Sequence, residues 1–144
     1  MLVVGVMYDY FAAPSDEVAS AVLDGGPAHL EPVATKGLDP VVVMGKLEAL
    51  LTGRAYDDVV DDERSALLLA MEGDGEVLVL AVTDGLRDGL DRASGLSEIA
   101  AAWAQAEELS GSDPQQLAGV LGELQALAKR AVSKGERLYC WVCV

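Results

Sequence analysis

Three stretches of the chain carry the apolar patterns that are typical of β-strands. Residues 1 to 13 are rich in β-branched and aromatic residues and end before Pro14. Every position of residues 77 to 82 is apolar, which favours a strand that is covered on both faces. Residues 137 to 144 close the sequence with a further apolar run. The pattern therefore predicts an N-terminal, a central and a C-terminal strand.

Apolar residues at helical spacing fill the segments between these strands. The clearest helix begins at Asp113-Pro114, where proline suits the first helical position, and ends at Gly135. Ser15 is the expected N-cap of a helix after the first strand, and Gly53 is the expected C-cap of another. Further helices are predicted within residues 54 to 72, after Thr83, and around residues 99 to 106.

Strands that lie far apart in sequence, with helices between them, indicate an α+β fold. We expect a small mixed sheet of about three or four strands, covered by about five or six helices. The chain has 144 residues, which suits a single globular domain over residues 1 to 144 and suffices to bury a core without disulfides.

Composition indicates which residues form the core and in which compartment the protein is expected. Hydrophobic residues make up 51% of the chain but aromatic ones only 5%, so valine, leucine and alanine must form most of the core. No apolar run is long enough to span a bilayer, and no basic segment precedes the first apolar run. We therefore expect a cytoplasmic protein, and the lack of asparagine suggests a GC-rich bacterial genome.

The balance of charge narrows the choice of partners. The chain carries 24 acidic and 10 basic residues, a formal charge of -14, which disfavours binding to nucleic acid or to an anionic membrane. Lys129, Arg130, Lys134 and Arg137 form the one basic cluster, at the end of a predicted helix, where cations complement the helix dipole. An acidic surface keeps a protein soluble, and it can also meet a basic protein partner.

The last strand contains Cys140-Trp141-Val142-Cys143, a C-x-x-C motif. Redox motifs of this kind precede a helix, and zinc sites need a second pair of ligands. Side chains alternate along a strand, so Cys140 and Cys143 should lie on opposite faces of the sheet. We therefore interpret both as structural cysteines, and no cofactor is expected.

Five acidic residues lie within positions 57 to 63. Clustered carboxylates suit Ca²⁺ or Mg²⁺, but the spacing of an EF-hand is missing. The alternative is a solvated turn whose later acids begin the helix that follows, and this interpretation is favoured. We assign no metal ligand, and divalent binding by this run is left open.

A second group of residues is a candidate for binding a small molecule. Asp9 lies between Tyr8 and Tyr10, and a carboxyl group beside aromatic rings can have a raised pKa, as catalytic acids often do. His29 is the only histidine, and Trp103 could form a wall of such a site. No nucleophile elbow or phosphate-binding loop accompanies them, so no catalytic residue is assigned.

The central strand, the helices after it and the terminal strand resemble the YfbM-like family of small bacterial proteins in outline. The segment Leu-Glu-Ala-Leu-Leu-Thr-Gly at residues 47 to 53 is similar to a helix end of that family. The resemblance implies a cytoplasmic α+β domain and supplies no catalytic residues. The C-x-x-C ending and the low aromatic content depart from it.

The leading hypothesis is a non-catalytic interaction or regulatory domain whose acidic surface binds a basic protein, for example as an antitoxin-like inhibitor. The alternative is a small-molecule-binding protein or small enzyme with a site at Tyr8, Asp9, Tyr10 and His29. A homodimer, formed through a strand edge or through the helix over residues 113 to 134, is a third alternative.

Overall fold

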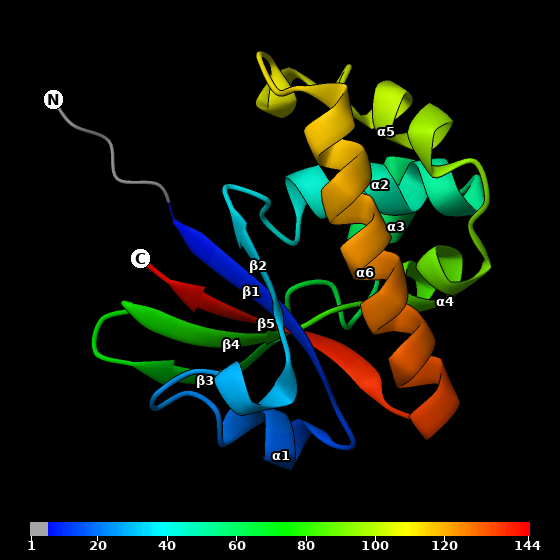
Figure 1. Cartoon of the computed structure of the whole chain (residues 1–144). Helices are drawn as coiled ribbons and strands as arrows, with labels where there is room; N and C mark the ends of the chain where they lie inside the picture. The colour runs from blue at the N-terminus through cyan, green and yellow to red at the C-terminus, as the bar shows by residue number, and fades with distance from the viewer. Residues whose placement is uncertain (1–5) are drawn as a thin grey trace, which may run out of the picture.

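A computed structural model describes residues 6 to 144, so the first five positions of the predicted N-terminal strand lie outside it. The fold combines a five-stranded sheet with helices (Figure 1). The elements are β1 (Met7–Ala13), α1 (Asp16–Ser20), η1 (Ala28–Leu30), β2 (Val33–Lys36), α2 (Val42–Thr52), α3 (Tyr56–Val60), β3 (Leu68–Glu72), β4 (Val77–Ala81), α4 (Asp84–Arg92), α5 (Leu96–Trp103), η2 (Glu107–Leu109), α6 (Pro114–Lys134) and β5 (Arg137–Cys143).

The sheet has the strand order β2-β1-β5-β4-β3, and all neighbouring strands are antiparallel. The last strand of the chain, β5, therefore lies at its centre between β1 and β4. This arrangement confirms the α+β class. It corrects the expected sheet in two details, because there are five strands instead of three or four and the sheet is antiparallel instead of mixed.

The two strands that sequence patterns missed are the short strands at the edges. β2 lies in a segment for which neither a helix nor a strand was predicted, and β3 lies within residues 54 to 72, where a helix was predicted. The residues of β3 are Leu-Leu-Ala-Met-Glu, which favour helices when taken alone. Pairing with β4 across a tight turn overrides that local preference, because the partner strand supplies the hydrogen bonds.

Helices cover the two faces of the sheet unequally (Figure 1). Residues of α2, α4, α5 and α6 join one face of β1 and β5 in the larger hydrophobic cluster. The opposite face is covered by the short helix α1 and the chain after it, in a cluster that contains Phe11, Val79 and Tyr139. None of the helices within residues 6 to 144 is both long and apolar enough to cross a membrane.

The longest helix, α6, follows the sequence signals closely. Asp113 caps it by accepting a hydrogen bond from the Gln115 amide at 2.9 Å, and Pro114 is its first residue. It ends at Gly135, whose φ of 67° is a conformation that glycine adopts without strain. Its leucines and alanines at helical spacing are buried in the larger hydrophobic cluster, between the sheet and the other helices: Leu117, Leu121, Leu124, Leu127, Ala128 and Ala131.

Candidate functional site

The residues predicted to bind a small molecule do not meet in one place. Tyr8 and Tyr10 lie on the face of β1 that the larger helices cover, and Tyr10 is fully buried with its hydroxyl donating to the Leu38 carbonyl. Asp9 points to the opposite face, as alternation along a strand requires. His29 is exposed in η1, on a different part of the chain.

Trp103 packs into the larger core and donates its indole N–H to the Val43 carbonyl at 3.0 Å. It contributes to a hollow of about 360 Å³ between α2, α3 and α5, together with Leu50 and Tyr56. The expected role as a wall therefore has a structural counterpart, but the hollow contains none of the other predicted ligand-binding residues.

Asp9 has a carboxyl group with a raised pKa, although Tyr8 and Tyr10 lie on the other face of the strand. Burial raises the pKa of its carboxyl group, and one of its carboxylate oxygens is buried without a hydrogen-bond partner among the described residues. It faces Trp141 across the β1–β5 pair. Burial alone accounts for the raised pKa of Asp9 within the described residues.

The side chains of the C-x-x-C motif alternate between the two faces of the sheet, as predicted. Cys140 lies in the larger cluster with Leu138 and Val142, whereas Trp141 packs against the cluster on the other face. Both cysteines are free thiols. Burial raises the pKa of the Cys140 thiol, which makes the reactive thiolate scarce at neutral pH.

The acidic run is divided between two elements. Asp57 and Asp58 lie in the first turn of α3, where carboxylates interact favourably with the positive end of a helix. The prediction that the later acids begin a following helix is wrong, because residues 61 to 67 form turns that lead into β3. Among residues 6 to 144, no group of three or more acidic, histidine or cysteine side chains is placed to hold a metal ion.

The free edge of β3 is the candidate site that sequence patterns missed. Leu68 and Met71 are 51% and 52% exposed, and Leu67, just before the strand, is 43% exposed. Leu68 lies opposite Leu80 of β4, and Met71 lies opposite Leu78. Both therefore point to the face of the sheet that carries the larger hydrophobic cluster. Within the described residues no strand pairs with the outer edge of β3.

Carboxylates bracket this apolar edge. Three acids precede the strand in sequence: Asp61, Asp62 and Glu63. Three more lie at its last position or just after it: Glu72, Asp74 and Glu76. The one basic residue in the same stretch, Arg64, is held by Asp16 at 3.2 Å. Within residues 61 to 76, the two groups of acids around this apolar edge are therefore not balanced by a free basic residue.

One signal in the sequence could have revealed this edge. Two apolar runs, residues 66 to 71 and 77 to 82, are joined by a short segment that contains Gly-Asp-Gly. Such spacing is typical of a β-hairpin, and it competes with the helical interpretation of the first run.

Comparison of the chain with protein-family models, with curated proteins and with solved structures finds no match. The resemblance to the YfbM-like family therefore stays a prediction from the sequence. The residues of the chain form an α+β domain with an antiparallel sheet and an exposed strand edge that acidic residues flank.

Proposed function

We propose that this chain is a non-catalytic interaction domain that binds an extended, basic segment of a partner protein along the edge of β3. The observation that carries the proposal is the combination of half-exposed Leu68 and Met71 with carboxylates at both ends of the same strand. The apolar side chains favour a partner that covers them, and the carboxylates favour a partner with lysine or arginine.

The geometry supports an added strand. An edge strand offers backbone N–H and C=O groups to a second chain, which is the basis of peptide recognition by strand addition. A shift of register between Leu68 and Ala70 interrupts the edge. Such an irregularity disfavours long sheet-to-sheet pairing, so the proposed partner segment is short.

Charge favours a basic partner over a second copy of the same chain. Two copies would each bring a formal charge of -14, and pairing their β3 edges would bring like charges together. A basic segment would be attracted over a long range by the whole protein and would then find opposite charges at both ends of the strand. The homodimer is therefore the weaker alternative.

A synthetic ten-residue peptide of alternating lysine and valine is a suitable probe, with a peptide of alternating glutamate and valine as its control. We expect the basic peptide to perturb the backbone NMR signals of residues 67 to 72. Its association rate should fall steeply with salt while its dissociation rate changes little, because long-range attraction acts mainly on encounter.

A matched pair of variants separates the β3 site from general attraction between opposite charges. Met71→Lys and Val132→Lys change the net charge equally, and the two wild-type side chains are 52% and 41% exposed. We expect Met71→Lys to weaken peptide binding about tenfold and Val132→Lys to weaken it less than about twofold. Equal losses, or signals that move only outside β3, would show that the edge is not the binding site.

A further inference from the structure

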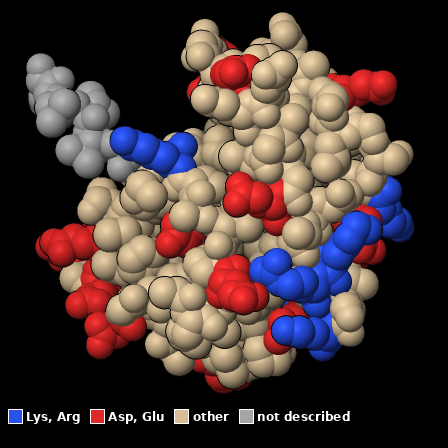
Figure 2. Space-filling model, in the orientation of Figure 1, with Lys and Arg blue, Asp and Glu red and all other residues tan. Residues whose placement is uncertain are grey.

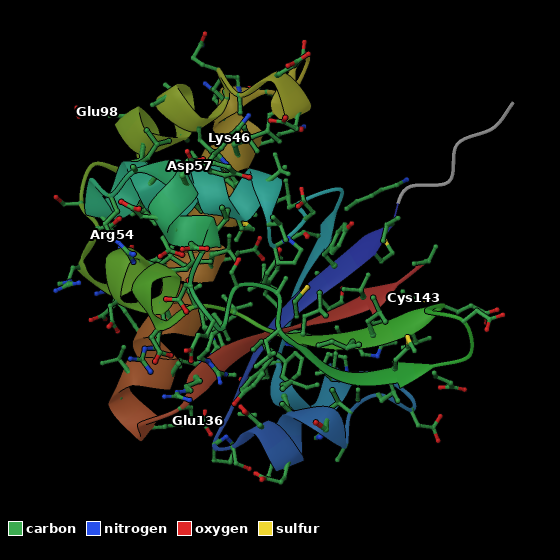
Figure 3. The ribbon with its side chains drawn as sticks, turned by 180° about the vertical axis from the view of Figure 1, so that it is seen from behind. Lys46, Arg54, Asp57, Glu98, Glu136 and Cys143 are labelled. Atoms are coloured by element: carbon green, nitrogen blue, oxygen red, sulfur yellow. The ribbon has the colours of Figure 1, made fainter. Side chains whose placement is uncertain are left out.

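A small polar pocket lies between η1 and the last turns of α6. Its volume is about 190 Å³, and its charged or polar lining residues are His29, Glu31, Arg130, Lys134 and Glu136. Ala12, Leu30 and Leu127 complete its lining with apolar atoms. Figure 3 labels Glu136 where α6 passes into β5, at the end of the molecule where basic side chains gather in Figure 2.

The charged residues of this pocket are not neutralised by one another. Among residues 6 to 144, no ion pair within 4.0 Å involves Glu31, Arg130, Lys134 or Glu136. In contrast, the neighbouring Lys129 lies 3.7 Å from a carboxylate oxygen of Asp91. Two cations and two carboxylates therefore line one pocket without pairing.

The backbone at the edge of the pocket is held in an unusual conformation. Glu31 has a φ of 52°, in the left-handed region that non-glycine residues rarely adopt. Arg130 donates a hydrogen bond to the carbonyl oxygen of Glu31 at 3.1 Å and so connects α6 to this turn. Strained residues of this kind concentrate at binding sites, because the surrounding structure must hold them in place.

The balance of charge identifies the chemical class of ligand. With a neutral imidazole the four charged residues of the pocket sum to zero, in a chain whose formal charge is -14. A simple anion would be repelled by the protein as a whole, and a simple cation would find many other carboxylates. A zwitterion has no net charge to repel, and its two ends can each meet a side chain of opposite sign.

We propose that this pocket binds a small zwitterion that carries one carboxylate and one ammonium group, of the size of a small free amino acid. Arg130 and Lys134 would bind the carboxylate, and Glu31 and Glu136 the ammonium group. The pocket volume of about 190 Å³ is large enough for several water molecules and therefore for a ligand of that size. This site is independent of the proposed strand addition at β3, since the two share no residue.

NMR titration of the full chain with each of the common L-amino acids tests the proposal. Acetate, methylamine and inorganic phosphate serve as single-charge and oxyanion controls. At least one amino acid should shift the signals of residues 29 to 31 and 130 to 136, at concentrations about tenfold below those that acetate or methylamine needs. Equal or tighter binding of phosphate or acetate would identify a simple anion site, and the absence of shifts with every amino acid would equally overturn the proposal.

Variants locate the site. Lys134→Gln changes an exposed residue and should leave the melting temperature nearly unchanged while it weakens amino-acid binding several-fold. Arg130→Gln should weaken binding by about tenfold, because a fork of donors to the carboxylate is lost. Lys129→Gln removes a charge next to Arg130 in sequence but outside the pocket. The affinity of this variant for the amino acid should stay within about twofold of the wild-type affinity. Similar losses in all three variants would contradict this location.

Discussion

The carboxylate of Glu48 accepts a hydrogen bond from the hydroxyl of Thr83, and this buried contact connects α2 to the start of α4. Glu48 is 2% exposed and Thr83 is 5% exposed. The same Thr83 oxygen caps α4 by accepting from the Leu86 amide at 3.2 Å. The second carboxylate oxygen of Glu48 has no hydrogen-bond partner among the described residues, and the nearest cation is Arg54 at 3.9 Å. A single threonine thus caps a helix and binds one of the two carboxylate oxygens of a buried acid.

A substitution of Thr83 should destabilise the protein more when it removes the hydroxyl group than when it keeps it. Thr83→Val removes the cap of α4 and leaves the buried Glu48 oxygen without its donor, so we expect a loss of about 2 to 4 kcal/mol in the free energy of unfolding. Thr83→Ser keeps the hydroxyl and should cost less than about 1.5 kcal/mol. Denaturant titration of both variants measures the difference, and equal losses would show that the hydroxyl has no special role.

Glu48 should make stability fall as the pH rises. Its burial raises the pKa of this carboxyl group in the folded state above the ordinary value of 4.5. Between 4.5 and the raised value the folded state binds the proton more tightly than the unfolded state, so the stabilising contribution is lost as the pH increases through this window. The difference in unfolding free energy between wild type and Glu48→Gln should therefore decrease as the pH rises above 4.5.

Asp16 provides a control of opposite sign. Hydrogen bonds from Arg64 and, to a smaller extent, from Tyr139 lower the pKa of this carboxyl group from its ordinary value of 3.8. Its contribution to stability should therefore be present above pH 3.8 and be lost as the pH falls below that value. If Asp16→Asn and Glu48→Gln change the pH dependence in the same direction, one of the two assignments is wrong.

Gly85 should be intolerant of alanine because of the same buried acid. A Cβ atom at this position would overlap a carboxylate oxygen of Glu48, although alanine ordinarily stabilises a helix relative to glycine by about 1 kcal/mol. We expect Gly85→Ala to cost about 1 to 3 kcal/mol in the wild type. In a Glu48→Ala background the same substitution should be neutral or stabilising, which differential scanning calorimetry can measure.

Gly119 is the matched control for this substitution. It lies in α6, and a Cβ there would meet no atom within 4 Å. Gly119→Ala should therefore stabilise the protein by about 0.5 to 1 kcal/mol. If Gly119→Ala destabilises the protein, helix propensity and the clash with Glu48 do not explain the effects of alanine at the two positions.

The two cysteines should differ in reactivity because they lie on opposite faces of the sheet. Cys140 is fully buried and burial raises its thiol pKa, whereas Cys143 is partly exposed. In the native protein a thiol-specific chromogenic reagent should label one cysteine, and the Cys143→Ser variant should react at least about a hundredfold more slowly. Formation of an intramolecular disulfide in the native protein would contradict the alternation of their side chains.

Much of the fold was predictable from local signals. Ser15 caps α1 as expected, and the Asp113-Pro114 pair and Gly135 mark the ends of α6, because capping chemistry acts within a few residues of the helix ends. Alternation of side chains along the terminal strand correctly placed Cys140 and Trp141 on opposite faces of the sheet, because this alternation is also a local property of the backbone. These features depend on backbone geometry that each short segment carries with it.

The candidate sites depended on contacts between distant segments. Leu68 to Glu72 becomes a strand only because β4 pairs with it, and its exposed apolar edge exists only because no described strand covers the other side. The pocket at His29 likewise needs Arg130, which is about a hundred positions later in the chain, to reach the turn at Glu31.

The sequence by itself determined the class of fold, the acidic character and the place of the cysteines, since these follow from composition and local periodicity. Only the tertiary structure decided which strands are edges and which charged side chains share a pocket. The physical reason is that hydrogen-bond pairing and burial are set by neighbours in space, which local propensity does not encode.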